Sequence, residues 1–175
     1  DIEYMYLHLH HIHKTKKLTA EQIRQGWLTH TYSETDAPLF KKFPDSKAEK
    51  ENFLWVSNER ARILMEQGIL PPDTGAPQHN QHYNMIDAQL TTEIFGLLAP
   101  GNVELALQIA ELPVSTSASH EAASIANFYI AMHALAPLVD KSLSMQEQVF
   151  WLAEQATSVL PNNTFPIKMY QFVKQ

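Results

Sequence analysis

Polar side chains gather at the start of a helix that the sequence predicts over residues 119–136. Ser119, His120 and Glu121 come directly before small apolar residues at helical spacing, beginning with Ala122. The first N–H groups of a helix have no partner within it and carry partial positive charge. A phosphate or hydroxyl group of a ligand could therefore bind beside Ser119 and His120. The structural alternative is that Ser119 caps the helix, that His120 binds a neighbouring carbonyl, and that Glu121 only complements the helix dipole.

A second group of candidate residues consists of the histidines His8, His10, His11 and His13. They fall in the second half of a helix predicted over residues 1–14, where apolar residues recur at helical spacing. His8 and His11 lie one turn apart, as two metal ligands could. No acidic or histidine partner at ligand spacing accompanies that pair. We therefore interpret the group as a solvated face near the helix C-terminus, where imidazoles are favourable, and predict no metal ligands there.

The composition excludes several classes of protein. The 175 residues carry a net charge of -6, and Lys and Arg form no long stripe, so we expect no nucleic-acid partner. The chain has no cysteine, which excludes disulfides, thiol catalysis and thiolate metal sites. No apolar run approaches the roughly 20 residues that a membrane-spanning helix needs. The chain begins at Asp1 without a methionine or a signal-like segment, so we expect a cytoplasmic protein whose natural N-terminus lies upstream.

Helical periodicity and helix-start signals recur along the whole chain. Thr19 with Gln22, and Ser144 with Glu147, match the capping box, in which two side chains satisfy free N–H groups at a helix start. Gly68 follows a helical stretch and is placed to end it. We find no strand pair, no hairpin turn and no internal repeat in the sequence. The sequence therefore predicts an all-α fold.

The length and the apolar content predict a single domain over residues 1–175. Of these residues 45% are apolar, enough for a sizeable core. Residues 33–52 hold prolines and many charges with little periodicity, and we expect a surface loop there. Residues 69–77 form a proline-rich connector in which Gly75 allows a sharp turn. Residues 78–84 follow as a polar loop, rich in amide and imidazole groups, that is either solvated or faces a ligand.

No general catalytic motif is present: the chain has no glycine-rich phosphate loop, no HExxH and no nucleophile elbow. Instead, a set of short phrases occurs in order along the middle of the chain. They are Trp-Val-Ser-Asn-Glu (55–59), Gly-Ile-Leu-Pro-Pro-Asp-Thr-Gly (68–75), Ile-Asp-Ala-Gln-Leu (86–90), Gly-Leu-Leu-Ala-Pro-Gly-Asn (96–102), Ser-His-Glu (119–121) and Ala-Met-His-Ala-Leu (131–135). In order and spacing this set resembles the central portion of the ADP-ribosylglycohydrolase family. The similarity covers nearly the whole chain.

The resemblance implies an all-α hydrolase that removes ADP-ribose from proteins or small molecules. In that family a pair of magnesium ions positions the ligand and a water, and the bond at the anomeric carbon of the distal ribose is hydrolysed. The metal ligands come from an Asp-Asp-Thr phrase before the helix that begins here at Asp1, and from an Asp-x-Asp phrase beyond residue 175. Neither phrase lies in this chain. We therefore expect a domain truncated at both ends and inactive by itself, with Asp1 at best adjacent to a metal ligand.

The resemblance also assigns ligand-binding residues. Ser119 and His120 match the family's Ser/Thr-His pair, which faces the ligand, and Glu121 follows them with less support. Small side chains on the following helix would let neighbouring helices approach closely, so that polar residues at the helix starts converge. These three residues are therefore candidates for substrate binding.

Four further candidates precede the small-residue helix. Gln89 matches a residue that lines the ribose in the family, and Glu93 matches an acidic position. Asp87 stands where the family usually has glycine, which adds bulk and charge where backbone would approach a ligand. Asn58 also matches the family. The structural alternatives are an exposed polar position for Glu93 and a helix cap for Asn58.

These assignments lead to one geometric expectation and two functional hypotheses. We expect Gln89 and His120 to meet in a shared hollow that opens toward the start of the first helix. The first hypothesis is a hydrolase acting on an ADP-ribosylated protein or a small ADP-ribose-containing molecule, with magnesium ligands supplied from outside this chain. The alternative is a catalytically inactive homologue or fragment that binds a nucleotide sugar or a protein as a scaffold.

Overall fold

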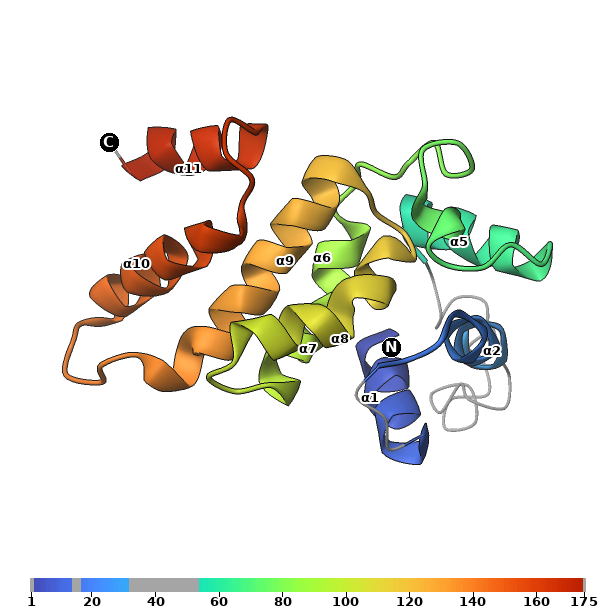
Figure 1. The fold of residues 1–175 in the computed structure, drawn as a ribbon, viewed down its shortest axis with the longest axis horizontal. Coiled ribbons are helices and arrows are strands. Elements are labelled where there is room, and N and C mark those ends of the chain that lie inside the picture. Colours follow the sequence, from blue (N-terminus) through green and yellow to red (C-terminus); the bar gives the residue numbers. More distant parts are fainter. Residues whose placement is uncertain (1, 14–16, 32–53, 175) are drawn as a thin grey trace, which may run out of the picture.

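The computed structural model describes residues 2–13, 17–31 and 54–174, and every regular element in these ranges is a helix (Figure 1). The α-helices are α1 (Ile2–His13), α2 (Ala20–His30), α5 (Val56–Glu66), α6 (Asp87–Thr92), α7 (Ile94–Leu98), α8 (Val103–Ser115), α9 (His120–Leu135), α10 (Met145–Ala156) and α11 (Phe165–Lys174). Short 3-10 helices are η1 (Asp73–Gly75), η2 (Ala136–Leu138) and η3 (Thr157–Val159). The all-α prediction is confirmed for these residues. Asp1 and the loop expected at residues 33–52 lie outside the described residues.

Both predicted capping boxes are present. The hydroxyl of Thr19 accepts a hydrogen bond from the N–H of Gln22 at 3.2 Å, and the side chain of Gln22 accepts one from the N–H of Thr19 at 2.9 Å. At α10, the carboxylate of Glu147 accepts bonds from the hydroxyl of Ser144 at 2.6 Å and from its N–H at 2.9 Å. These bonds lower the pKa of Glu147. The local sequence therefore sets where α2 and α10 begin.

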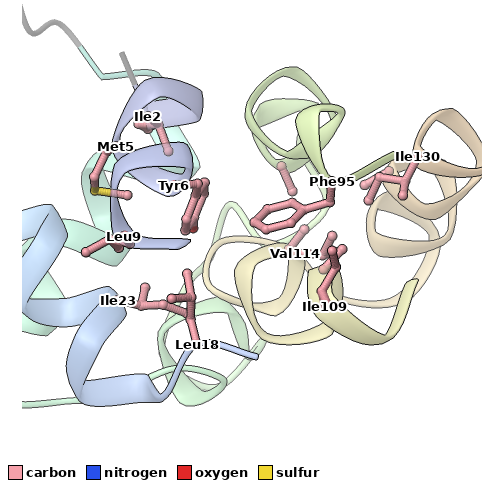
Figure 2. Close-up of a cluster of buried hydrophobic side chains, with 14 of the residues drawn as sticks. Ile2, Met5, Tyr6, Leu9, Leu18, Ile23, Phe95, Ile109, Val114 and Ile130 are labelled. Atoms are coloured by element: carbon pink, nitrogen blue, oxygen red, sulfur yellow. The ribbon is translucent and has the colours of Figure 1, made fainter. Parts of the chain in front are cut away.

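The core joins α1 and α2 to α7, α8 and α9 (Figure 2). The rings of Tyr6 and Phe95 are fully buried at its centre, with centroids 5.2 Å apart. The indole N–H of Trp27 donates to the Tyr6 hydroxyl at 3.3 Å. Burial raises the pKa of Tyr6 to about 12, although the hydrogen bond with Trp27 opposes the shift. Aliphatic side chains from four of these helices belong to the same cluster: Ile2, Met5, Leu9, Ile23, Ile109, Val114 and Ile130.

Helix α9 packs against α6, α7, α8, α10 and α11, and its small side chains allow close contacts, as predicted. Ala126 and Ala134 are completely buried. A Cβ atom added to Gly96 of α7 would lie only 2.4 Å from the carbonyl oxygen of Ile130 and 2.5 Å from the Cβ of His133. The backbone of α7 therefore rests directly on α9.

Helices α10 and α11 lie on the side of α9 that faces away from α1 and α2 (Figure 1). They are linked to each other by an ion pair between Lys174 and Glu154. Both helices expose large apolar side chains: Phe150 is 55% exposed, Phe172 72% and Val173 73%. This part of the chain is therefore less buried than the core around Phe95.

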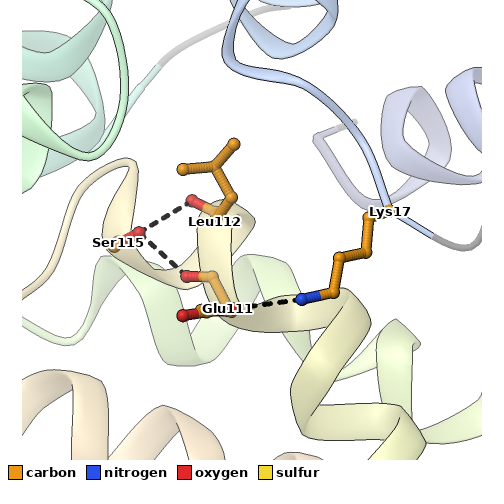
Figure 3. A network of polar contacts seen from close by, with 4 residues as sticks. All are labelled: Lys17, Glu111, Leu112 and Ser115. Atoms are coloured by element: carbon orange, nitrogen blue, oxygen red, sulfur yellow. Dashed lines mark hydrogen bonds and ion pairs between the residues drawn. The ribbon is translucent and has the colours of Figure 1, made fainter.

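The last turn of α8 carries a small polar network at the surface, which Figure 3 shows. The hydroxyl of Ser115 donates to the carbonyl oxygens of Glu111 at 2.8 Å and of Leu112 at 3.2 Å. The ammonium group of Lys17 lies 3.4 Å from the Glu111 carboxylate, with side chains 51% and 76% exposed. An ion pair so exposed contributes little to stability, so we regard it as a surface contact.

Candidate functional site

Asp87 is buried at the start of α6, where it caps a different helix. Its Oδ1 atom accepts hydrogen bonds from the backbone N–H groups of Ser57 at 2.8 Å and Asn58 at 3.0 Å. These groups belong to the first turn of α5, whose N-cap residue Trp55 makes no side-chain cap. The positive end of the helix dipole favours a carboxylate there. Asp87 therefore holds α5 against α6. The sequence had instead suggested a position beside a ligand.

Asn58 lies inside the first turn of α5, so its interpretation as a helix cap is wrong. Its side chain is buried, and so is that of Asp87. The oxygens Asn58 Oδ1 and Asp87 Oδ2 both lack a hydrogen-bond donor. The two candidates therefore meet in the interior, beneath the protein surface.

Asn80 organises the polar loop of residues 78–84 and was not singled out by the sequence. It is completely buried, and its amide donates to the carbonyl oxygens of Ser57 at 3.1 Å and Thr74 at 3.0 Å. Its side-chain oxygen accepts a bond from the N–H of His82 at 3.0 Å. The hydroxyl of Ser57 in turn donates to the carbonyl oxygen of Ser117, just before α9. One inward amide thus connects the loop to α5 and η1, although nothing in its spacing distinguishes it from the loop's other amides.

Ser119 does not cap α9 with its side chain. Its hydroxyl donates to the carbonyl oxygen of Gly75 at 2.7 Å, and its N–H donates to that of Tyr83 at 3.0 Å. The side-chain oxygen of Asn84 instead accepts the N–H of Ala122, in the first turn of α9, at 3.2 Å. The start of α9 is therefore held by the polar loop and by η1.

Gly75 lies in the tight turn η1, where the packing leaves no room for a side chain. A Cβ atom there would lie 2.2 Å from the carbonyl oxygen of Ser115 and 2.9 Å from the backbone nitrogen of Ala118. Next to it, the hydroxyl of Thr74 donates to the carbonyl oxygen of Thr116 at 2.7 Å. The connector at residues 69–77 is thus fastened to the end of α8.

Tyr83, Asn84 and His120 reach the surface together at the start of α9, and we call them the α9-start surface. The imidazole of His120 meets the ring of Tyr83 edge to face, with centroids 5.2 Å apart. His120 has a φ of 52°, a left-handed conformation that only a few per cent of non-glycine residues adopt. His120 and Asn84 are exposed, whereas Tyr83 is half-buried. Of these three residues the sequence proposed His120 for ligand binding, and it left the loop of Tyr83 and Asn84 as either solvated or facing a ligand.

Gln89 and Glu93 lie toward the other end of α9. The Gln89 amide donates to one oxygen of Glu93 at 3.3 Å, and the other oxygen lies 3.2 Å from the imidazole Nε2 of His133. Along the axis of α9, His133 lies about 20 Å from His120. The structure gives no hydrogen bond or ring contact between Gln89 and His120. Neither residue lines the cavity between α1 and α2 or the two cavities beside α8, so the hollow that they were expected to share is none of these. His133 is a partner that sequence spacing could not reveal.

Glu121 has a contact that its place in the first turn of α9 did not indicate. Its carboxylate accepts a hydrogen bond from the N–H of Phe165, the first residue of α11, at 3.1 Å. A carboxylate at a helix start is favourable for the reasons given for Asp87. Glu121 therefore fastens α11 to α9.

The described residues do not fit a magnesium site. Across residues 2–13, 17–31 and 54–174, no group of three His, Asp or Glu side chains could hold a metal ion. In α1, His8, His11 and His13 are exposed, as expected for a solvated face. The prediction is wrong for His10, which is half-buried with its ring 5.5 Å from that of Phe95, centroid to centroid. Any magnesium bound near the α9-start surface would need ligands from elsewhere.

Comparisons with models of protein families, with curated proteins and with solved structures gave no match to this chain. In the part of the chain that the structure describes, none of the helices combines the length and apolarity needed to cross a membrane. A function must therefore be inferred from the residues themselves and from the phrases that they form.

Proposed function

We propose that this chain is the central part of an ADP-ribosylglycohydrolase-like hydrolase, which cleaves an N- or O-glycosidic bond of ADP-ribose. The observation that carries the proposal is the buried hydrogen-bond network beneath the α9-start surface. It connects residues of four phrases on which the resemblance rests, namely Ser57, Gly75, Asp87 and Ser119. Phrases that are far apart in the sequence are thereby gathered at the start of α9, as residues serving one site would be.

The α9-start surface offers groups suited to an anionic nucleotide sugar. The N–H groups of His120 and Glu121 precede the first hydrogen bond within α9, from Ala123 to the carbonyl oxygen of Ser119. Their partial positive charge favours a diphosphate. The imidazole of His120 can donate to a phosphate or hydroxyl oxygen, and the ring of Tyr83 offers an apolar face to a base or a ribose. The substrate would be an ADP-ribosylated protein or a small ADP-ribose-containing molecule.

Magnesium ligands would have to come from residues outside the described part of the chain, since the described residues hold no suitable group. When bound, paired magnesium ions would activate a water and orient the ribose hydroxyls. The residues described here would then bind and orient the remainder of the ligand. For this chain alone we expect no hydrolysis and only weak magnesium binding.

The proposal is tested in two steps. Release of ADP-ribose from a modified protein is measured for the full-length gene product with and without magnesium, and magnesium-dependent release is expected. ADP-ribose binding is then measured by calorimetry with His120→Ala and, as a matched control on another exposed histidine, His11→Ala. We expect His120→Ala to weaken binding about tenfold, through loss of one hydrogen bond to a charged group, and His11→Ala to leave it unchanged. Absence of release under both conditions would count against a hydrolase.

The second candidate function is an inactive homologue or fragment that binds a nucleotide sugar or a protein as a scaffold. It is favoured by the structural use of two candidate residues: Asp87 caps α5, and Glu121 caps α11. Both carboxylates thereby hold helix starts in place. Binding of ADP-ribose by the full-length product, without release from any modified protein, would establish this alternative.

A further inference from the structure

A cavity of about 1110 Å³ lies between α1 and α2. Its volume is slightly above the range of small-molecule sites, which span roughly 300–1,000 Å³. Its walls are α1, α2 and the turn after α5, where Gly68 and Leu70 lie. None of its lining residues belongs to the α9-start surface or to the network beneath it. The cavity is therefore a separate site.

One wall of the cavity is apolar. Met5, Leu9 and Ile12 follow each other along one face of α1, and Leu70 adds to them from the turn after α5. Leu9 is pressed against the backbone of α2, because a Cβ atom at Gly26 would lie 2.8 Å from its Cδ1. This wall can bury a chain-like hydrocarbon body, which favours binding in proportion to the apolar area removed from water.

Helix α2 makes its side of the cavity charged, because it contributes Arg24. Its Nε–H donates to the carbonyl oxygen of Met65 at 2.7 Å, and this bond fixes the guanidinium group at the cavity. Arg24 is half-buried, whereas Glu21, the acidic residue of the lining, is exposed. Water screens an exposed charge more effectively than a half-buried one, so the charge of Arg24 is less screened than that of Glu21.

Imidazole groups also belong to the polar part of the lining, together with Gln22, Gln25 and Thr29. His8 and His13 come from α1 and His30 from α2. The ring of His30 lies 6.3 Å from that of Tyr4, centroid to centroid, across the two helices. Imidazoles can donate hydrogen bonds to a carboxylate at the same time as an arginine pairs with it.

We propose that this cavity binds a small amphipathic carboxylate, with its hydrocarbon chain along Met5, Leu9 and Ile12 and its carboxylate at Arg24. The site is independent of the proposed hydrolase activity and does not require it. The volume is close to that of known small-molecule sites, and the half-buried guanidinium favours an anion over a cation.

Decanoate and decyltrimethylammonium test this assignment, since they share a hydrocarbon chain and differ in the charge of the head group. Each is titrated calorimetrically into the full chain below its micelle-forming concentration. Saturable 1:1 binding is expected for decanoate, with the cation binding roughly tenfold or more weakly. Arg24→Gln is expected to weaken decanoate by a similar factor and to leave binding of the cation unchanged.

Two cavity-filling variants from different helices, His8→Trp and Thr29→Trp, are expected to abolish decanoate binding. His11→Trp is the matched control, because His11 is an exposed histidine of α1 outside the lining. Circular dichroism confirms which variants remain folded, and either filling variant suffices. The proposal is overturned if decanoate does not saturate, if both head groups bind equally, or if His11→Trp weakens binding as much as the filling variants. It is also overturned if binding survives filling and is lost in Phe150→Ala, which would place the ligand on α10.

Discussion

The Oδ1 oxygen of Asp87 lies 2.8 Å from the backbone nitrogen of Ser57, which precedes it by 30 residues. A carboxylate at the start of α6 thereby completes the first turn of α5. The hydroxyl of Ser57 extends the connection to Ser117, just before α9. Buried polar groups, together with apolar packing, therefore fix the relative positions of these three helix starts.

The stability of this junction can be tested at Asp87. Asp87→Ala should lower the free energy of unfolding by about 3 kcal/mol, because two buried N–H groups lose a charged acceptor. Asp87→Asn should lower the free energy of unfolding clearly less, since the amide oxygen still accepts hydrogen bonds. Its NH₂ group replaces Oδ2, an oxygen that has no donor in the folded protein. Urea denaturation measures both. The exposed residue Asp73 supplies the control, Asp73→Ala, with an expected change within about 0.5 kcal/mol; equal losses in the two Asp87 variants would contradict this role.

The glycines of α7 and η1 should tolerate alanine poorly. In Gly96→Ala and Gly75→Ala the new Cβ would meet backbone oxygen at 2.4 Å and 2.2 Å, and backbone cannot move without shifting a helix. We expect each substitution to lower the free energy of unfolding by about 3 kcal/mol. In Gly26→Ala the near atom is the flexible end of Leu9, at 2.8 Å, and alanine favours the helix. Thermal unfolding should therefore rank Gly26→Ala as the mildest variant, and the reverse order would contradict the packing of α7 on α9.

Tyr6 should make stability depend on alkaline pH. Its pKa is raised from 10.0 to about 12 in the folded protein, so the unfolded chain loses this proton first as pH rises. The contribution is fully present below about pH 10 and is lost between about pH 10 and 12, by up to roughly 3 kcal/mol. Denaturation across that range should show a steeper decline for the wild type than for Tyr6→Phe. Identical slopes for the wild type and Tyr6→Phe would exclude the effect.

The contact between Glu121 and Phe165 should govern how firmly α11 is held. Glu121→Ala removes the carboxylate that accepts the first N–H of α11, while the core around Phe95 is untouched. Amide hydrogen exchange should therefore become faster in α11 alone, with global stability changed by less than about 1 kcal/mol. Glu111→Ala, which removes an exposed surface ion pair, is the matched control and should leave α11 unaffected. Unchanged exchange in Glu121→Ala would show that α11 is held by other contacts.

The helix starts show which contacts can be predicted from the local sequence. Thr19 with Gln22 and Ser144 with Glu147 form their capping boxes as predicted, because both partners lie within one turn of the same helix. The role of Ser119 was not predicted, because its hydroxyl finds the carbonyl oxygen of Gly75, 44 residues away. Spacing within a helix carries no information about such a partner.

The candidate site divides in the same way. The sequence placed His120 at the start of a helix, which is where the structure has it, but predicted a hollow shared with Gln89 rather than an exposed position. It did not place Asp87 and Asn58 in the interior, nor pair Glu93 with His133 across 40 residues. Those outcomes depend on which helices pack together, and this is decided by burial of Phe95 and the small face of α9 rather than by any local pattern.

By itself the sequence determined that the chain is helical, where several helices begin, and that α9 would present a face of small side chains. These properties follow from backbone propensity, capping and periodicity, all of which act over a few residues. Only the tertiary structure decided which polar groups would be buried together and which would remain at the surface. A buried N–H or carboxylate must find a partner wherever the fold brings one. The residues next to it in the sequence do not indicate which distant residue that partner will be.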